Sequence, residues 1–133
     1  MSESPDLTRA APDGWESVHF AEQAPDGEAL AAAGIRLATL DGAPIESKDE
    51  LMAAIAAALE FPDYFGGNWD ALDESLRDLG SWLQDAGHVL AIANGESLWR
   101  RRPELAGMLV RAWTDAARHW GEQGAPFHLV FVR

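Results

Sequence analysis

Three short apolar runs along the chain have the length and composition of β-strands. They are IRLATL at 35–40, GHVLAIANG at 87–95 and FHLVFVR at 127–133. The second run is almost continuously apolar, which is typical of a strand covered on both faces, as in a parallel sheet. A fourth run, WESVHF at 15–20, alternates only weakly and predicts a short edge strand.

The segments between these runs have the periodicity and the end signals of helices. Ser47, followed three residues later by Glu50, forms a capping-box pattern at the start of KDELMAAIAAALE. Asn68 is the expected N-cap of a second helix, over 69 to about 79. A further helical segment, ESLWRRRPELAGMLVRAWTDAARHW, has a predicted break at Pro103.

The predicted order is strand, helix, helix, strand, helix, helix, strand. Strands that alternate with helices indicate right-handed parallel crossovers. We therefore expect an α/β fold with a three-stranded parallel sheet and helices packed on it. We expect residues 35–133 to form this domain. Residues 1–34 are expected to form an N-terminal extension that is partly disordered, because residues 1–14 are rich in Pro, Asp, Ser and Gly.

Composition and charge narrow the range of functions. The net charge is −12, and so negative a surface repels phosphate backbones and anionic lipids. We therefore expect a basic protein as the partner, and neither nucleic acid nor a membrane; simple solubility is the alternative explanation of the charge. The absence of cysteine excludes disulfides, zinc–thiolate sites and thiol catalysis. The chain starts without a secretory-signal pattern, and no apolar run approaches the about 20 residues of a membrane span, so we expect a cytoplasmic protein.

No motif in the chain predicts a cofactor, a metal or an enzyme. The P-loop, GxGxxG and GxSxG patterns are absent. The histidines, which show no spacing of metal ligands, are His19, His88, His119 and His128. The three arginines before Pro103 indicate a solvated helix end. Paired carboxylates could support glycosidase chemistry, but here they lie on one exposed helix face, and we expect no enzymatic activity.

The predicted helix after Asn68 has one apolar and one acidic side. At about 100° per residue, the apolar side comprises Trp69, Leu72, Leu76, Leu79 and Leu83. Asp70, Asp73 and Glu74 lie on the opposite side, at spacings where like charges repel. The helix N-terminus offsets part of this repulsion, and a bound cation would offset more. The acidic side is therefore a candidate recognition surface.

The loop before this helix adds two further signals. Gly66 and Gly67 allow backbone conformations closed to other residues and close approach of another surface. Tyr64, just before them, offers a flat contact area and a hydroxyl group. Loop and helix together predict a recognition patch for a positively charged cleft. A tight turn between two helices, with a solvated polar face, is the alternative.

The stretch FPDYFGGNWDALDESLRDL resembles the signature of the barstar family, the intracellular inhibitors of barnase-type ribonucleases. The matching positions are Pro62, Tyr64, Gly66, Asn68, Asp70, Ala71 and Leu72. The resemblance covers roughly residues 35–133, in the same order of strands and helices. It implies a barstar-like fold and an inhibitor that covers a ribonuclease active site with this acidic helix and the preceding loop. An immunity or protein-binding module of the same fold, whose partner is not a ribonuclease, remains the alternative.

The resemblance also implies roles for single residues. Tyr64 would contact the edge of the ribonuclease cleft, and Gly66 would permit close backbone approach. Trp69 stands where the family has an apolar residue, and Asp70 matches the first inhibitory aspartate. The carboxylates of the inhibitor would take the places of RNA phosphates among the cationic groups of the enzyme.

Two positions depart from the family pattern, which has tryptophan and then aspartate where this chain has Asp73 and Glu74. Glu74 retains the charge and moves it by one methylene, and these departures are compatible with a ribonuclease other than barnase. Asp115 on the last helix is a candidate for a further acidic contact. The predicted partner-binding residues are therefore Tyr64, Gly66, Asn68, Trp69, Asp70, Asp73, Glu74 and Asp115. The expected partner is a basic ribonuclease or similar toxin, and we expect a monomer when the protein is free.

Overall fold

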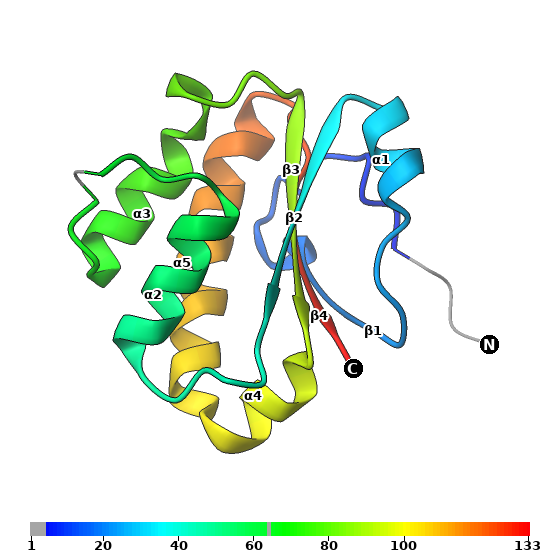
Figure 1. Cartoon of the computed structure of the whole chain (residues 1–133). Coiled ribbons are helices and arrows are strands. Elements are labelled where there is room, and N and C mark those ends of the chain that lie inside the picture. Colours follow the sequence, from blue (N-terminus) through cyan, green and yellow to red (C-terminus); the bar gives the residue numbers. More distant parts are fainter. Residues whose placement is uncertain (1–4, 64) are drawn as a thin grey trace.

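A parallel β-sheet forms the centre of the fold (Figure 1). The computed structural model describes residues 5–63 and 65–133, and within them one sheet has four strands in the spatial order β1-β4-β3-β2. The strands are β1 (Val18–Ala21), β2 (Ile35–Asp41), β3 (Gly87–Ala93) and β4 (Phe127–Val132). Every pairing is parallel. The predicted α/β class is confirmed; the sheet has four strands rather than three, because the weakly alternating run also pairs with β4.

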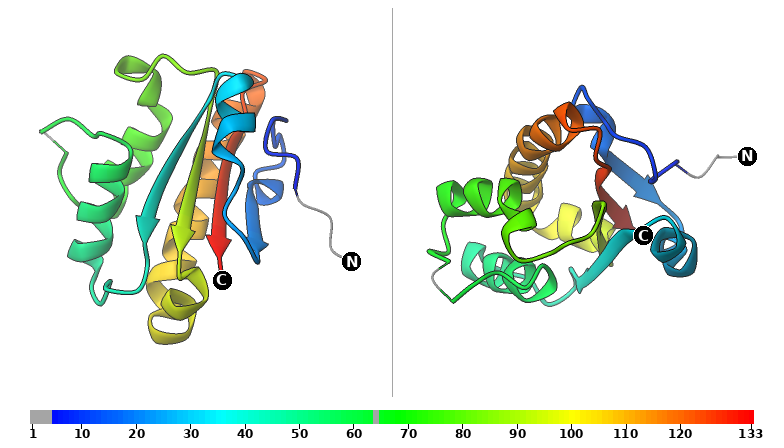
Figure 2. Two further views of the ribbon diagram at one scale, coloured as in Figure 1. Left: turned by 45° about the vertical axis from the view of Figure 1, so that its right-hand side comes forward. Right: turned by 90° about the horizontal axis from the view of Figure 1, so that it is seen from above.

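The helices divide unequally between the two faces of the sheet. They are α1 (Gly27–Ala32), α2 (Lys48–Ala58), α3 (Trp69–Arg77), α4 (Gly95–Arg101) and α5 (Pro103–Glu122), with 3-10 turns η1 (Trp15–Ser17) and η2 (Leu79–Ser81). Figure 2 shows α2, α3 and α5 on one face of the sheet and α1 on the other. Leu7 of the N-terminal segment joins the buried cluster under α1, whereas Pro12 lies against Gly121 of α5. The break at Pro103 is confirmed, since this proline is the first residue of α5.

The main core lies between the sheet and the three helices. Leu72 and Leu76 of α3 are fully buried there, as the helical wheel predicts. Trp113 of α5 stacks on Phe127 of β4, with ring centroids 4.2 Å apart. The indole of Trp120, also on α5, donates to the backbone carbonyl of Leu76 at 2.9 Å. These contacts fix α3 against α5 and leave its acidic side facing outward.

Two of the three arginines before α5 hold the loop between β2 and α2, which corrects the expectation of a solvated helix end. The guanidinium of Arg101 donates to the carbonyls of Gly42 and Ile45 at 2.8 and 2.9 Å. It also pairs with Glu46 at 2.6 Å. Arg102 donates to the carbonyl of Glu46 at 2.9 Å. The loop and α4 are thereby joined by charge-assisted hydrogen bonds.

Replacing Arg101 by alanine is expected to lower the free energy of unfolding by about 1–3 kcal/mol, because the change removes charged donors from two backbone carbonyls. Urea denaturation measures this. Arg100→Ala is the matched control, since Arg100 is exposed and forms no ion pair within the described residues. It is expected to change stability by less than about 0.5 kcal/mol. Equal losses in the two variants would contradict the anchoring role.

The segment before β2 packs against the sheet. β1 pairs with β4, and the side chain of Asp26 caps α1 by accepting two backbone N–H groups. His128 donates from Nε2 to the carbonyl of Arg9 at 2.6 Å, so its Nδ1 accepts from Nε2 of His19 at 2.9 Å. The division of the chain into an extension and a domain at residue 34 stays a prediction.

Candidate protein-binding site

Two described residues with positive φ and one helix cap shape the loop between α2 and α3. Glu60, at φ 57°, turns the chain away from α2, and Gly67, at φ 70°, adopts the left-handed conformation that favours glycine. Asn68 then begins α3, because its side chain accepts the backbone N–H of Ala71 at 2.8 Å. The predicted cap is confirmed. Gly66, the predicted point of close approach, is exposed, but the left-handed glycine of the pair is Gly67.

Aromatic residues of the loop pack against each other and against Trp82. Phe61 and Phe65 form an edge-to-face pair with ring centroids 4.8 Å apart. Phe61 also lies 6.0 Å from the ring of Trp82, whose indole N–H donates to the carbonyl of Leu59 at 3.1 Å. These contacts were not predicted from the sequence. Tyr64, the predicted contact at the cleft edge, lies outside the described residues.

The outer side of α3 presents the predicted carboxylates in two different states. Asp70 and Glu74 are exposed. Asp73 is half-buried, and its carboxylate pairs with Arg77 one turn further along the helix. Trp69 is half-buried and packs against the core. Asp70 and Glu74 therefore lie at the surface, without an ion pair among the described residues, on a helix whose other side is fixed in the core.

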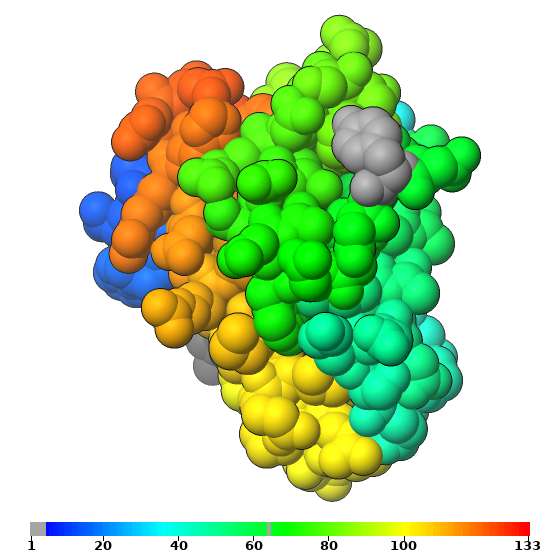
Figure 3. Space-filling model, turned by 90° about the vertical axis from the view of Figure 1, so that its left-hand side faces the viewer, coloured from blue at the N-terminus to red at the C-terminus, as the bar shows by residue number. Residues whose placement is uncertain are grey.

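The surface around α3 is acidic over a wider area than these residues. Asp63 in the loop and Asp78 after the helix are also exposed, so that residues 61–78 carry five carboxylates and one arginine. Figure 3 shows this face, with α3 in green between α2 in teal and α5 in orange. An exposed surface of this charge attracts cationic groups and accelerates association with a basic partner.

Asp115 is exposed on α5, the helix next to α3. Its carboxylate Oδ1 forms an ion pair with the guanidinium Nη1 of Arg118 at 3.8 Å. The two helices run in the same direction (Figure 1), and Trp120 contacts Leu76 near the end of α3. Asp115 precedes Trp120 by about one and a half helical turns. It therefore lies level with the first half of α3, on the neighbouring helix.

Metal ligation and membrane insertion find no support in the described part of the chain. Across residues 5–63 and 65–133, no cluster of three or more His, Asp or Glu side chains could hold a metal ion. No helix in these same ranges has the length and apolar character needed to cross a bilayer.

A comparison with protein-family models identifies the family of this chain. The model described as Barstar (barnase inhibitor) matches residues 35–132. The chain belongs to the barstar family. The match begins at the first residue of β2 and ends at the last residue of β4, so β1 and α1 precede the barstar region. Barstar family members are inhibitors and not enzymes. No curated protein matched the chain in a sequence comparison.

Proposed function

We propose that this protein is a cytoplasmic inhibitor that blocks the active site of a basic ribonuclease with α3 and the loop before it. The observation that carries the proposal is the pair of exposed carboxylates of Asp70 and Glu74 on the outer side of α3. A ribonuclease binds RNA phosphates with cationic side chains, and carboxylates pair with the same cations. Two carboxylates held one helical turn apart therefore suit a cleft built for phosphates.

The support beneath α3 favours tight binding. The Asn68 cap and the buried Leu72 and Leu76 fix the helix before a partner arrives, and the ring contacts of Phe61 fix the start of the loop. A surface that is ordered in advance loses less conformational entropy on association. The inhibitor is a monomer when free, and it protects the cell that makes the ribonuclease.

A binding module for a basic toxin other than a ribonuclease is the second candidate. It is favoured by the ion pair between Asp73 and Arg77, which neutralises one carboxylate of the surface where the family pattern has an aromatic residue. Glu74, one methylene longer than the aspartate of the pattern, also changes the position of the charge. Both differences alter the shape that a partner cleft must match.

Inhibition of RNA cleavage tests the proposal directly. A barnase-type ribonuclease and other basic ribonucleases are titrated with the purified protein in the presence of a fluorogenic RNA substrate. We expect complete inhibition of at least one enzyme at a one-to-one molar ratio. If every ribonuclease retains its activity and a basic toxin of another class binds instead, the second candidate replaces the first.

Association with the inhibited ribonuclease is expected to slow by more than about tenfold between about 50 mM and 500 mM salt, because the acidic surface steers a basic partner over a distance that salt shortens. Stopped-flow fluorescence measures the association rate. The dissociation rate should change much less. An association rate that is indifferent to salt would mean that the net charge serves solubility and not recognition.

A further inference from the structure

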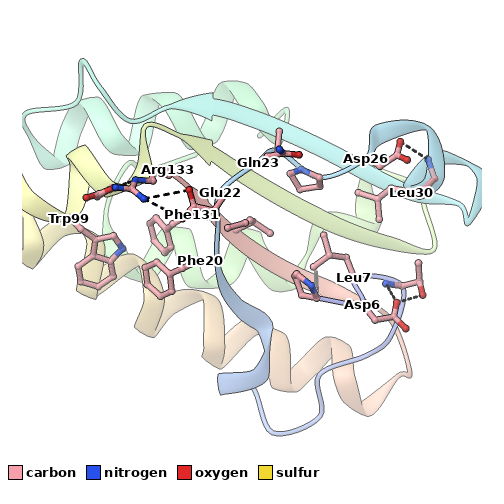
Figure 4. Close-up of a pocket in the computed structure, with 18 residues that line it drawn as sticks. Asp6, Leu7, Phe20, Glu22, Gln23, Asp26, Leu30, Trp99, Phe131 and Arg133 are labelled. Atoms are coloured by element: carbon pink, nitrogen blue, oxygen red, sulfur yellow. Dashed lines mark hydrogen bonds and ion pairs between the residues drawn. The ribbon is translucent and has the colours of Figure 1, made fainter. Parts of the chain in front are cut away.

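The face of the sheet that carries α1 is covered thinly. Its buried cluster contains strand residues and, among the described residues, only Leu7 and Leu30 from outside the strands. A groove of about 1100 Å³ reaches from this face to the side of the sheet that carries α4, since Leu30 and Trp99 both line it. It is lined by residues 5–8, the 20–26 segment and α1, together with side chains of α4 and β4 (Figure 4).

One end of the groove is aromatic, with the exposed ring of Phe20 over the buried ring of Phe131. Phe20 of β1 is 68% exposed although it is a large apolar residue. Its ring stacks on Phe131, with centroids 5.3 Å apart, and lies 6.0 Å from the ring of Trp99. Figure 4 shows these three rings at one end of the groove and Leu7 and Leu30 at the other. An open aromatic face attracts apolar groups and, through its quadrupole, cations.

The rim of the groove is predominantly acidic. Its charged side chains are Asp6, Glu22, Asp26, Glu96 and Arg133. Arg133 pairs with Glu22 at 3.3 Å and with Glu96 at 3.1 Å. These three side chains are exposed, and ion pairs between exposed groups contribute little stability. A guanidinium or ammonium group of a partner can therefore replace Arg133 beside the aromatic rings at little cost.

We propose that this groove binds an extended segment of a second, basic protein partner, with apolar side chains against its floor and lysine or arginine side chains at its rim. The negative rim and the open aromatic end supply the complementarity. A second copy of this chain fits poorly, because its net charge of −12 would face the same acidic rim. Among the described residues, none of α3 or of the loop before it lines the groove, so this binding goes beyond the proposed inhibition and is compatible with it.

A synthetic peptide tests the groove without knowledge of the natural partner. The probe is a fluorescein-labelled heptapeptide of alternating lysine and leucine, and a glutamate–leucine peptide of the same length is its counterpart. We expect the basic peptide alone to bind in fluorescence anisotropy titrations. In the double variant Glu22→Lys/Glu96→Lys its affinity should fall by about tenfold or more, as expected when attractive charges are reversed.

Two matched variants separate the groove from the general charge of the protein. Glu16→Lys/Glu122→Lys makes the same change of charge at exposed positions outside the groove, and its affinity should stay within about twofold of the parent. Asp70→Lys/Glu74→Lys should likewise retain peptide binding, so a failure of this proposal and of the inhibitor proposal are distinguishable. The proposal would be overturned if all three double variants lost peptide affinity equally, or if both peptides bound. It would also be overturned if sedimentation experiments showed self-association in place of peptide binding.

Discussion

Replacing Asp70 or Glu74 by alanine is expected to weaken binding to the inhibited ribonuclease by about 2–5 kcal/mol each. In the complex, each carboxylate would lie among cationic side chains of the cleft, away from water. Removing it leaves those cations desolvated and unpaired, which costs more than the loss of a surface ion pair. Isothermal titration calorimetry of each variant with the ribonuclease measures the effect.

Asp73 provides an internal comparison. Its carboxylate is half-buried and already paired with Arg77, so Asp73→Ala is expected to weaken binding by about 1 kcal/mol or less. Asp13→Ala, at an exposed position in the N-terminal segment, should change binding by less than about 0.5 kcal/mol. Circular dichroism and urea unfolding establish that each variant is folded. If Asp70→Ala and Glu74→Ala are folded and bind like the parent, α3 is not the inhibitory surface, although the family and the fold remain.

Acidification is expected to destabilise the protein through His88. This side chain is fully buried, and neither of its ring nitrogens has a hydrogen-bond partner within the described residues. Burial lowers the pKa of His88 to about 4; nearby Asp85 raises it and Arg36 lowers it by smaller amounts. Trp120 and Phe127 contact the ring, with centroids 5.4 and 6.4 Å away. The neutral imidazole is therefore the form that the folded state accommodates.

The direction of the pH effect follows from proton binding. Between pH 6.5 and about 4 the unfolded chain binds a proton at His88 that the folded chain does not bind, so the free energy of unfolding falls as the pH falls. The loss from His88 reaches about 3 kcal/mol near pH 4. Burial also lowers the pKa of His19 to about 4, so protonation of His19 likewise lowers the free energy of unfolding on acidification.

Urea denaturation of the parent and of His88→Leu at pH 7 and pH 4.5 measures this contribution. The carboxylates titrate in both proteins, so the difference between their losses of stability on acidification isolates His88. We expect the variant to lose about 2 kcal/mol less than the parent. An equal loss in the two proteins would show that His88 is hydrated or paired in the folded state.

The parts of the fold that depend on neighbours along the chain were predictable. The caps at Ser47 and Asn68 form with backbone groups three residues away, so each signal lies within one short stretch of sequence. The apolar runs likewise identify β3 and β4, because nearly continuous apolar sequence is what a strand covered on both faces requires. The shorter apolar run of β2 identifies a strand that lies at the edge of the sheet. The exposure of Asp70 and Glu74 follows from the burial of the leucines on the opposite side of α3.

The parts that depend on distant segments were not predictable. Arg101 finds its acceptors more than fifty residues earlier in the chain, and nothing in the run of arginines indicates these carbonyls. The contact of Phe61 with Trp82 likewise joins two separate elements. In the sequence, Asp73 and Glu74 are two adjacent carboxylates that Arg77 could equally reach. The structure shows that the Arg77 side chain pairs with Asp73.

The position of β1 has a consequence for shortened forms of this protein. The barstar match begins at Ile35, which makes this residue an obvious place to cut. β1 nevertheless pairs with Leu129, Val130, Phe131 and Val132 of β4, and without it one side of an apolar strand would present unpaired N–H and C=O groups. Such edges are templates for aggregation. The segment before the family region thus covers the edge of β4 through β1. A shortened protein that begins before Val18 keeps this pairing.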